Sequence, residues 1–172
     1  MPSTSYRTLF TLAGSVLLFD QLTKWIVQST LPFESSYYPP DRVSVIENFF
    51  YLVHIGNEGA AWGLFSNYKE LLIFMAFIVL AFIYFARRQF ELEKPCMQIA
   101  FGALIGGILG NLIDRFRLGY VIDFIDIHLP LRIPIILPDG RWPAFNIADS
   151  AIVIGLFYYL ILSLIESRTK IV

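Results

Sequence analysis

The chain has few charged residues and almost no cysteine. Asp, Glu, Lys and Arg make up 16% of its 172 residues, compared with about 25% in a typical soluble domain. The single cysteine, Cys96, excludes an internal disulfide and a metal centre built of cysteines. The two histidines, His54 and His128, lack the spacing of a metal-binding motif, and the net charge of −1 provides no basic surface for nucleic acid. We therefore expect no metal, no other cofactor and no nucleic-acid partner.

Apolar residues are abundant instead. They make up 56% of the chain, above the share of about 45–50% in a soluble domain, and the mean hydropathy is +0.63. Four apolar stretches predict membrane-spanning helices at about residues 9–28, 69–86, 97–114 and 146–166. The first stretch continues past Asp20 and Lys24 without a cleavage site, so we expect it to be retained. The predicted fold class is an all-α integral membrane protein, a bundle of four transmembrane helices in a single domain of residues 1–172.

The two long connections between the predicted spans have different compositions. Residues 29–68 contain the stretch RVSVIENFFYLVHIG, whose β-branched and aromatic residues predict strands. Residues 115–145 contain several prolines and a turn signal at Asp139-Gly140.

The distribution of Lys and Arg predicts the orientation in the membrane. These residues are dense in the short segments on one side of the predicted bundle, which hold Arg7, Arg87, Arg88, Lys94, Arg168 and Lys170. On the other side they are spread over the two long connections. Because cytoplasmic segments are enriched in Lys and Arg, we expect both termini in the cytoplasm and both long loops outside.

The polar residues of the predicted spans converge on one side. In an antiparallel bundle, the end of the first span, the start of the second, the end of the third and the start of the fourth lie together. The polar residues in these positions are Asp20, Lys24, Asn111, Asp114, Arg115, Asn146 and Asp149. Charges inside a membrane are costly and usually mark a functional site or an internal pair, so this outer side is the expected place of a site.

Several of these residues also have purely structural interpretations. Asp20 and Lys24 are spaced to form an ion pair on one helix face. In the third span, Gly102, Gly106 and Gly110 repeat every four residues, which favours close helix packing.

Asp114 and Arg115 can cap the third helix at the interface, although we favour a role in holding the loop that presents Asp123. Asn146 can cap the fourth helix, and Asp149 in the first turn suits the helix dipole. Helix capping is therefore the structural alternative to a chemical role for Asp149.

Two carboxylates in apolar surroundings remain as candidates for chemistry, Asp123 in GYVIDFIDI and Asp149 in FNIAD. Two neighbouring carboxyls do not both ionise easily, so one retains a proton. Such a pair can activate water with one member and hydrogen-bond a scissile carbonyl with the other. Asp126 lies three residues after Asp123 and is expected to point to the opposite face of a strand. A serine–lysine dyad is a weaker alternative, because Lys24 already has Asp20 as its expected partner.

At these residues the chain resembles the prolipoprotein signal peptidase family, signal peptidase II, whose members are integral-membrane aspartic peptidases. The resemblance rests on motifs that occur in the family's order: DQLTK, NEGAAWG, GGILGNLIDR, GYVIDFID and FNIAD. Each motif alone would be weak, but the ordered set is specific. It departs from the family in residues 127–144, which are longer than expected and suggest an added hairpin that turns at Asp139-Gly140.

The resemblance implies that Asp123 and Asp149 are the catalytic aspartates. The residues expected to support them are Asn57, Gly59, Asn111, Asp114, Arg115, Asn146, Asp20 and Lys24. It also implies cleavage before the diacylglyceryl-modified cysteine of bacterial prolipoproteins, contact with membrane lipid, and sensitivity to globomycin-type inhibitors. The expected location is the bacterial cytoplasmic membrane, with the site and a small β-rich cradle facing the periplasm, and the expected state is a monomer.

Two other classes of protein fit parts of the sequence. A small proton-coupled transporter could use Asp20, Lys24, Asp114 and Asp149 as relay groups, but transporters place such charges near the membrane midplane. A membrane scaffold without activity would not need two acids in apolar surroundings.

Overall fold

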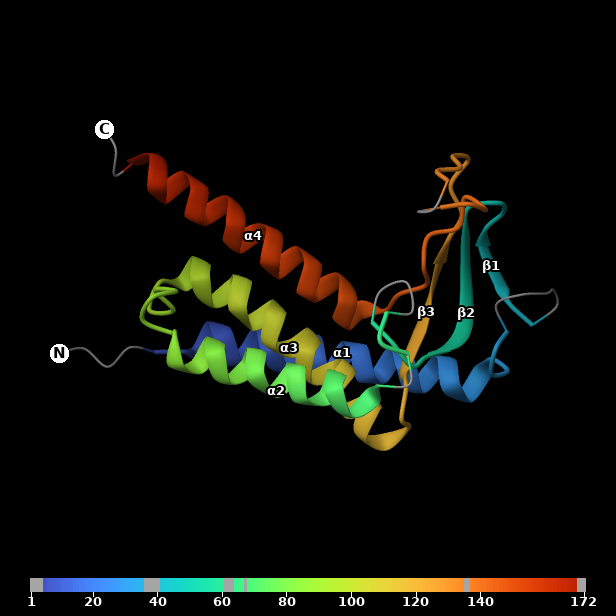
Figure 1. Cartoon of the computed structure of the whole chain (residues 1–172), viewed down its shortest axis with the longest axis horizontal. Coiled ribbons are helices and arrows are strands. Elements are labelled where there is room, and N and C mark those ends of the chain that lie inside the picture. The colour runs from blue at the N-terminus through green and yellow to red at the C-terminus, as the bar shows by residue number, and fades with distance from the viewer. Residues whose placement is uncertain (1–4, 36–40, 61–63, 67, 135–136, 170–172) are drawn as a thin grey trace. The chain divides into compact units, whose positions relative to one another are not determined.

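The structure is a computed structural model, and it describes residues 5–35, 41–60, 64–66, 68–134 and 137–169 (Figure 1). Three residues of the NEGAAWG motif, Ala61, Trp62 and Gly63, lie outside the described residues, as does Lys170.

Four helices and three strands make up the described chain. The helices are α1 (Arg7–Thr30), α2 (Lys69–Phe85), α3 (Pro95–Arg117) and α4 (Ile147–Thr169), and the strands are β1 (Val43–Ile46), β2 (Phe50–Asn57) and β3 (Val121–Ile127). Each predicted span coincides with a helix, and the strands predicted between residues 29 and 68 are β1 and β2. The prediction of helices accompanied by a small β-rich part is confirmed.

Two of the helices are long and apolar enough to cross a membrane, counted over the described part of the chain. These are α3 and the segment Ile147–Ser167 of α4. Helix α1 contains Asp20 and Lys24, which lower its hydropathy. Helix α2 has 17 residues and is about 26 Å long at 1.5 Å per residue, somewhat less than the ~30 Å of a bilayer core. Membrane crossing by α1 and α2 therefore stays a prediction.

The chain folds into two compact units. Unit 1 contains Met1–Asp20, Ile73–Ile113 and Ile147–Val172, and unit 2 contains Gln21–Leu72 and Asp114–Asn146. Helix α1 contributes its first part to unit 1 and its last part to unit 2.

Unit 1 is held together by apolar packing and by glycines. Its buried cluster is formed by Leu9, Ile83, Leu92, Ala100 and Phe101. On α3, a Cβ added at Gly102 or at Gly106 would lie 2.9 Å or 2.7 Å from a carbonyl oxygen of α1. The backbones therefore approach more closely than any larger residue allows, and the prediction that these glycines serve helix packing is confirmed.

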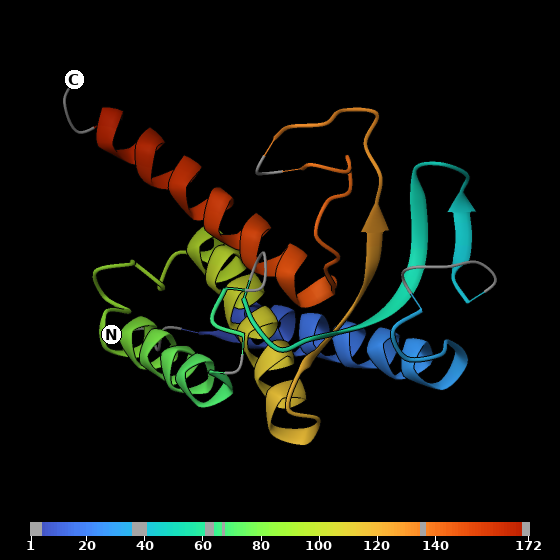
Figure 2. The ribbon, with the colours of Figure 1, turned by 45° about the vertical axis from the view of Figure 1, so that its right-hand side comes forward.

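Unit 2 is built around an antiparallel sheet with the order β1-β2-β3 (Figure 2). In the register of β2 and β3, Ile55 is opposite Asp123 and Asn57 is opposite Val121. After β3 the chain returns along the same strand, where Phe145 and Ile125 exchange backbone hydrogen bonds of 2.8 and 3.1 Å. This return places the next residue, Asn146, beside the middle of β3.

The predicted hairpin in residues 127–144 exists, but its predicted turn is wrong. His128 is bridged to Arg141 and Ile133 to Leu137, so the chain reverses between Ile133 and Leu137. Gly140, with a φ of 72°, does form a tight turn, in which its N–H donates to the carbonyl of Leu137. That turn only bends the returning arm of the hairpin.

Candidate active site

Asp123 is the central acid of unit 2. It lies on β3 and is only 2% exposed, and its neighbours Ile122 and Phe124 are also buried. Its Oδ2 accepts a hydrogen bond of 2.9 Å from Asn57 Nδ2, and its Oδ1 accepts one of 2.7 Å from Asn146 Nδ2. Strand β2 supplies one carboxamide and the returning segment supplies the other, so both carboxylate oxygens are held.

The orientation of both carboxamides is fixed by backbone groups. Asn57 Oδ1 accepts the N–H of Gly59 at 2.9 Å, and Asn146 Nδ2 also donates to the carbonyl of Ile122 at 3.3 Å. A backbone N–H can only donate and a carbonyl can only accept, so both side chains must present their NH2 groups to Asp123. Two such donors suit an ionised carboxylate.

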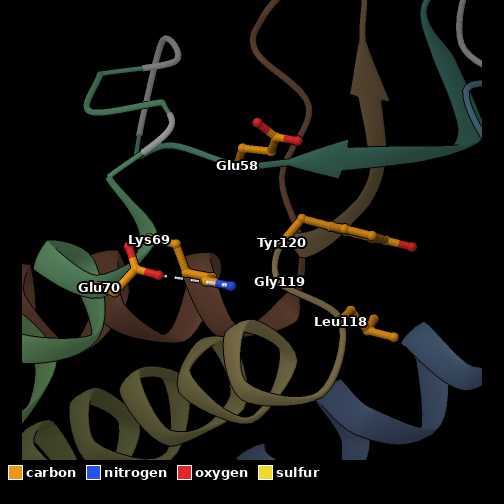
Figure 3. A pocket seen from close by; sticks show the side chains of 6 residues that line it. All are labelled: Glu58, Lys69, Glu70, Leu118, Gly119 and Tyr120. Carbon is orange, nitrogen blue, oxygen red and sulfur yellow. Dashed lines mark ion pairs between the residues drawn. The ribbon is translucent and has the colours of Figure 1, made fainter.

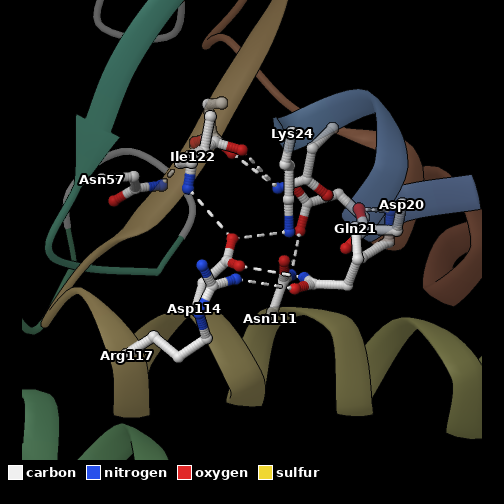
Figure 4. Close-up of polar contacts among 12 residues, drawn as sticks. Asp20, Gln21, Lys24, Asn57, Asn111, Asp114, Arg117 and Ile122 are labelled. Carbon is white, nitrogen blue, oxygen red and sulfur yellow. Dashed lines mark hydrogen bonds and ion pairs between the residues drawn. The ribbon is translucent and has the colours of Figure 1, made fainter. Parts of the chain in front are cut away.

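Asp114 ties three elements of unit 2 together (Figure 4). It lies near the end of α3 and is 1% exposed. Its Oδ2 lies 2.9 Å from Lys24 Nζ on α1 and accepts the backbone N–H of Ile122 at 3.2 Å. The interpretation favoured from the sequence is that Asp114 holds the segment that presents Asp123. The contact with Ile122, the residue before Asp123, is the contact that this interpretation requires.

Gln21 belongs to the same cluster and was not singled out from the sequence. Its Nε2 donates to Asp114 Oδ1 at 2.9 Å, and its Oε1 accepts from Arg117 at 3.4 Å. The signal that could have found it is its position three residues before Lys24, which puts both side chains on one helix face.

Arg115 holds the segment that follows β2. Its Nη2 donates to the carbonyl of Gly59 at 2.8 Å. Gly59 is buried, and it lies two residues after Asn57.

Unit 1 contains the second candidate acid. Asp149 is in the first turn of α4, and its Oδ1 accepts a hydrogen bond of 2.7 Å from Asn111 Nδ2 on α3. Asp20, which is fully buried, accepts the N–H of Ala148 at 2.9 Å. Asp20 thus satisfies one of the backbone donors that every helix leaves unpaired at its N-terminus.

The structure therefore groups the predicted residues as follows: Asp123 with Asn57 and Asn146, Lys24 with Asp114, Arg115 with Gly59, and Asp149 with Asn111. Asp123 and Asp149 belong to different units, and their pairing stays a prediction. The ion pair of Asp20 with Lys24 also stays a prediction.

Asp126 is engaged by an arginine and a histidine. It is fully buried, its Oδ1 accepts from Arg141 Nε at 2.7 Å, and its Oδ2 lies 3.0 Å from His128 Nε2. The contact with Arg141 joins β3 to the returning arm of the hairpin, so Asp126 has a structural role. Over the described residues, no group of three or more His, Cys, Asp or Glu side chains could hold a metal ion.

A pocket of about 370 Å³ also opens on unit 2 (Figure 3). Its lining is formed by Glu58, Lys69, Glu70, Leu118, Gly119 and Tyr120. Lys69 Nζ and Glu70 Oε1 are 3.9 Å apart; the Glu70 side chain is largely exposed to solvent and that of Lys69 is partly exposed. The lining includes none of the predicted site residues, all of which the structure describes, so we do not place the chemistry in this pocket.

The fold is that of known membrane enzymes. One bacterial membrane enzyme, solved by the in meso method at 2.3 Å resolution, superposes with a TM-score of 0.80 and 33% identity, over 95% of this chain and 91% of that one. A second, solved at 1.9 Å, gives a TM-score of 0.72 and 33% identity, over 91% and 92%. The helices, the sheet and these similarities define a membrane protein of the enzyme class.

The family follows from the sequence comparisons. The model of the signal peptidase II family, Peptidase_A8, matches residues 12–165. The lipoprotein signal peptidase of Nitratidesulfovibrio vulgaris is 38% identical over 91% of this chain and 89% of the relative. That of Moorella thermoacetica is 36% identical over 84% of each. The chain belongs to the signal peptidase II family of aspartic peptidases, which decides against the transporter and scaffold alternatives.

Proposed function

We propose that the chain removes signal peptides from diacylglyceryl-modified bacterial prolipoproteins by cleaving before the lipidated cysteine. The family membership supports the reaction. The observation that carries the proposal for this chain is the buried carboxylate of Asp123, with each oxygen held by a carboxamide of fixed orientation.

In this proposal Asp149 is the partner of Asp123. The chain itself supports the pairing, because Asn146, which donates to Asp123, lies only three residues before Asp149. One carboxylate takes a proton from water, and the water oxygen attacks the scissile carbonyl carbon. The protonated partner hydrogen-bonds the carbonyl oxygen, and a proton passes to the amine nitrogen as the C–N bond breaks. All atoms of the reaction come from peptide and water.

We further propose that all four helices span the bacterial cytoplasmic membrane with both termini in the cytoplasm. The sheet then forms a periplasmic cradle beside the site. The density of Lys and Arg in the short segments supports this orientation. Sensitivity to globomycin-type inhibitors and a monomeric state belong to the same proposal.

The test is cleavage of a purified diacylglyceryl prolipoprotein by the wild type, Asp123→Asn and Asp149→Asn. Each substitution keeps the shape of the side chain and removes the proton exchange, so each should lower kcat by about 10⁴-fold, as for members of other catalytic units. The double variant should be little slower than either single one, because residues that act as a unit are not additive. Asp139→Asn, in the exposed hairpin, is the matched control.

Near-wild-type cleavage by Asp149→Asn would make Asp149 a helix cap and would remove the dyad from the proposal. Absence of cleavage by the wild type would remove the substrate assignment itself.

A further inference from the structure

The segment after β2 determines how one of the two carboxamides meets Asp123. Asn57 is the last residue of β2, and its Oδ1 accepts the N–H of Gly59. This hydrogen bond closes a short turn, in which a side-chain oxygen takes the backbone N–H two residues further on. The amide NH2 is thereby directed to Asp123. The position of Gly59 therefore decides the direction of the donor.

Gly59 is itself held from α3. Arg115 Nη2 donates to the carbonyl of Gly59 at 2.8 Å. Arg115 lies in the last turn of α3, a regular helix of 23 residues, so the guanidinium starts from a rigid support. A series of three hydrogen bonds then runs from Arg115 to the Gly59 carbonyl, from the Gly59 N–H to Asn57 Oδ1, and from Asn57 Nδ2 to Asp123 Oδ2.

We propose that Arg115 is a positioning residue for Asp123 and that it acts through Gly59 and Asn57. The inference rests on the proposed function, since it concerns the geometry of the proposed catalytic carboxylate. A lysine would keep the charge but lose the planar, forked set of donors that holds a carbonyl in one direction. Gly59 would then be free to shift, and the amide of Asn57 would follow it.

A purely structural role for Arg115 predicts something different. A cation in the last turn of a helix favours the helix dipole, and Arg115→Lys would preserve that effect. The two roles therefore separate in the lysine variant, which keeps the charge and changes the donor geometry.

The first experiment is a double-mutant cycle measured by prolipoprotein cleavage. Arg115→Lys should lower kcat by roughly 10- to 100-fold, the effect of a displacement of about 1 Å at a reacting group. KM should change by less than about threefold, because the interaction that is lost is not one with substrate. Asn57→Ala should lower kcat at least as much, and the double variant should be no slower than Asn57→Ala alone. Arg132→Lys, in the exposed hairpin, is the matched control and should cleave like the wild type.

If the reductions in kcat of the two single variants multiplied in the double variant, Arg115 would act independently of Asn57. If Arg115→Lys raised KM and left kcat unchanged, Arg115 would act on the substrate. Either result would overturn the inference.

The second experiment does not depend on turnover. The side-chain amide of Asn57 gives a ¹⁵N–¹H₂ resonance, which can be identified by its loss in Asn57→Ala. Arg115→Lys should shift this resonance and Arg132→Lys should leave it in place. If the wild type failed to cleave prolipoprotein, the proposed function would fall, while the resonance would still decide the connection between Arg115 and Asn57. An unshifted resonance in Arg115→Lys would overturn the inference even in a fully active enzyme.

Discussion

The two units of the chain hold their functional residues in different ways. Unit 1 is mainly apolar, although hydrogen bonds hold Asp149 and the start of α4. Its core is an apolar cluster around Leu9 and Phe101, and glycines let the helix backbones touch. In unit 2, side chains are placed by hydrogen bonds, and its buried residues include Lys24, Asp114 and Asp123. Unit 1 thus relies mainly on packing around a few hydrogen bonds, whereas unit 2 holds its buried ionic residues by hydrogen bonds and an ion pair.

This difference predicts different sensitivities to substitution. A buried ion or amide that loses its partner carries the full cost of desolvation. A packed glycine that gains a methyl group only strains its surroundings. We therefore expect the loss of stability to be largest when a buried polar side chain of unit 2 is removed. It should be smaller for glycine substitutions in unit 1 and smallest for the removal of an exposed ion pair.

The largest effect is expected for Lys24→Met. The substitution leaves the carboxylate of Asp114 in a site that is 1% exposed without its 2.9 Å ammonium partner. Breaking a buried ion pair from one side costs about 3–5 kcal/mol. The free energy of unfolding in detergent, measured by denaturant titration, should fall by that amount. Lys69→Met, whose side chain is 43% exposed, is the control and should change it by no more than about 0.5 kcal/mol. Equal effects of the two substitutions would remove burial as the reason for the difference between the units.

The next effect is expected for Gly107→Ala in unit 1. A Cβ at Gly107 would meet the carbonyl oxygen of Ala148 and would lie 2.8 Å from Ile152 Cγ1. Overpacking of this kind costs about 1–3 kcal/mol, partly offset by the higher helix propensity of alanine, about 1 kcal/mol. The midpoint of thermal unfolding should fall accordingly.

Gly14→Ala is the matched control for this substitution, because a Cβ at Gly14 meets nothing within 4 Å. It should be neutral or stabilising by up to about 1 kcal/mol. Stabilisation by both alanines would show that α3 and α4 can separate without cost.

A smaller effect is expected for Asp20→Ala. The alanine removes the acceptor of the Ala148 N–H at the start of α4, and loss of a helix cap costs about 0.5–2 kcal/mol. Asp20→Asn keeps an acceptor oxygen and should lose less. Thermal unfolding of the two variants gives the comparison, and an equal loss in both would mean that the charge of Asp20, rather than its hydrogen bond, stabilises the helix.

Much of this arrangement could be predicted from the sequence, and the limits have a physical cause. Apolar runs located the four helices, and β-branched residues located β1 and β2, because both signals are local. The role of Asp114 in holding the segment of Asp123 could also be proposed from the sequence, because the two residues lie only nine positions apart.

The return of the chain along β3 could not be predicted in the same way. The pairing of Phe145 with Ile125, and of Asp126 with Arg141, depends on where the hairpin reverses. The turn signal at Asp139-Gly140 was real but marked a bend and not the reversal, because a tight turn satisfies the same local preference in either place. Gln21 was missed because a glutamine on an apolar helix carries no charge to attract notice.

The smallest effect is expected for Lys94→Met, which isolates the contribution of burial. Lys94 Nζ lies 2.7 Å from Glu166 and 2.9 Å from Glu91, distances like that of Lys24 to Asp114. Its side chain, however, is 42% exposed, and water screens such pairs.

The hydrogen bonds to Glu166 and then to Glu91 raise the pKa of Lys94 above its usual range. A raised lysine pKa contributes stability that is fully present below the unfolded pKa of about 10.4 and is lost as the pH rises through the folded value. The small difference in unfolding free energy between the wild type and Lys94→Met should therefore stay constant from neutral to mildly alkaline pH and shrink only above about pH 10. Denaturant titrations in a series of buffers measure it. A loss as large as that of Lys24→Met would show that distance and not burial sets the strength of these ion pairs, and the contrast between the two units would then need another cause.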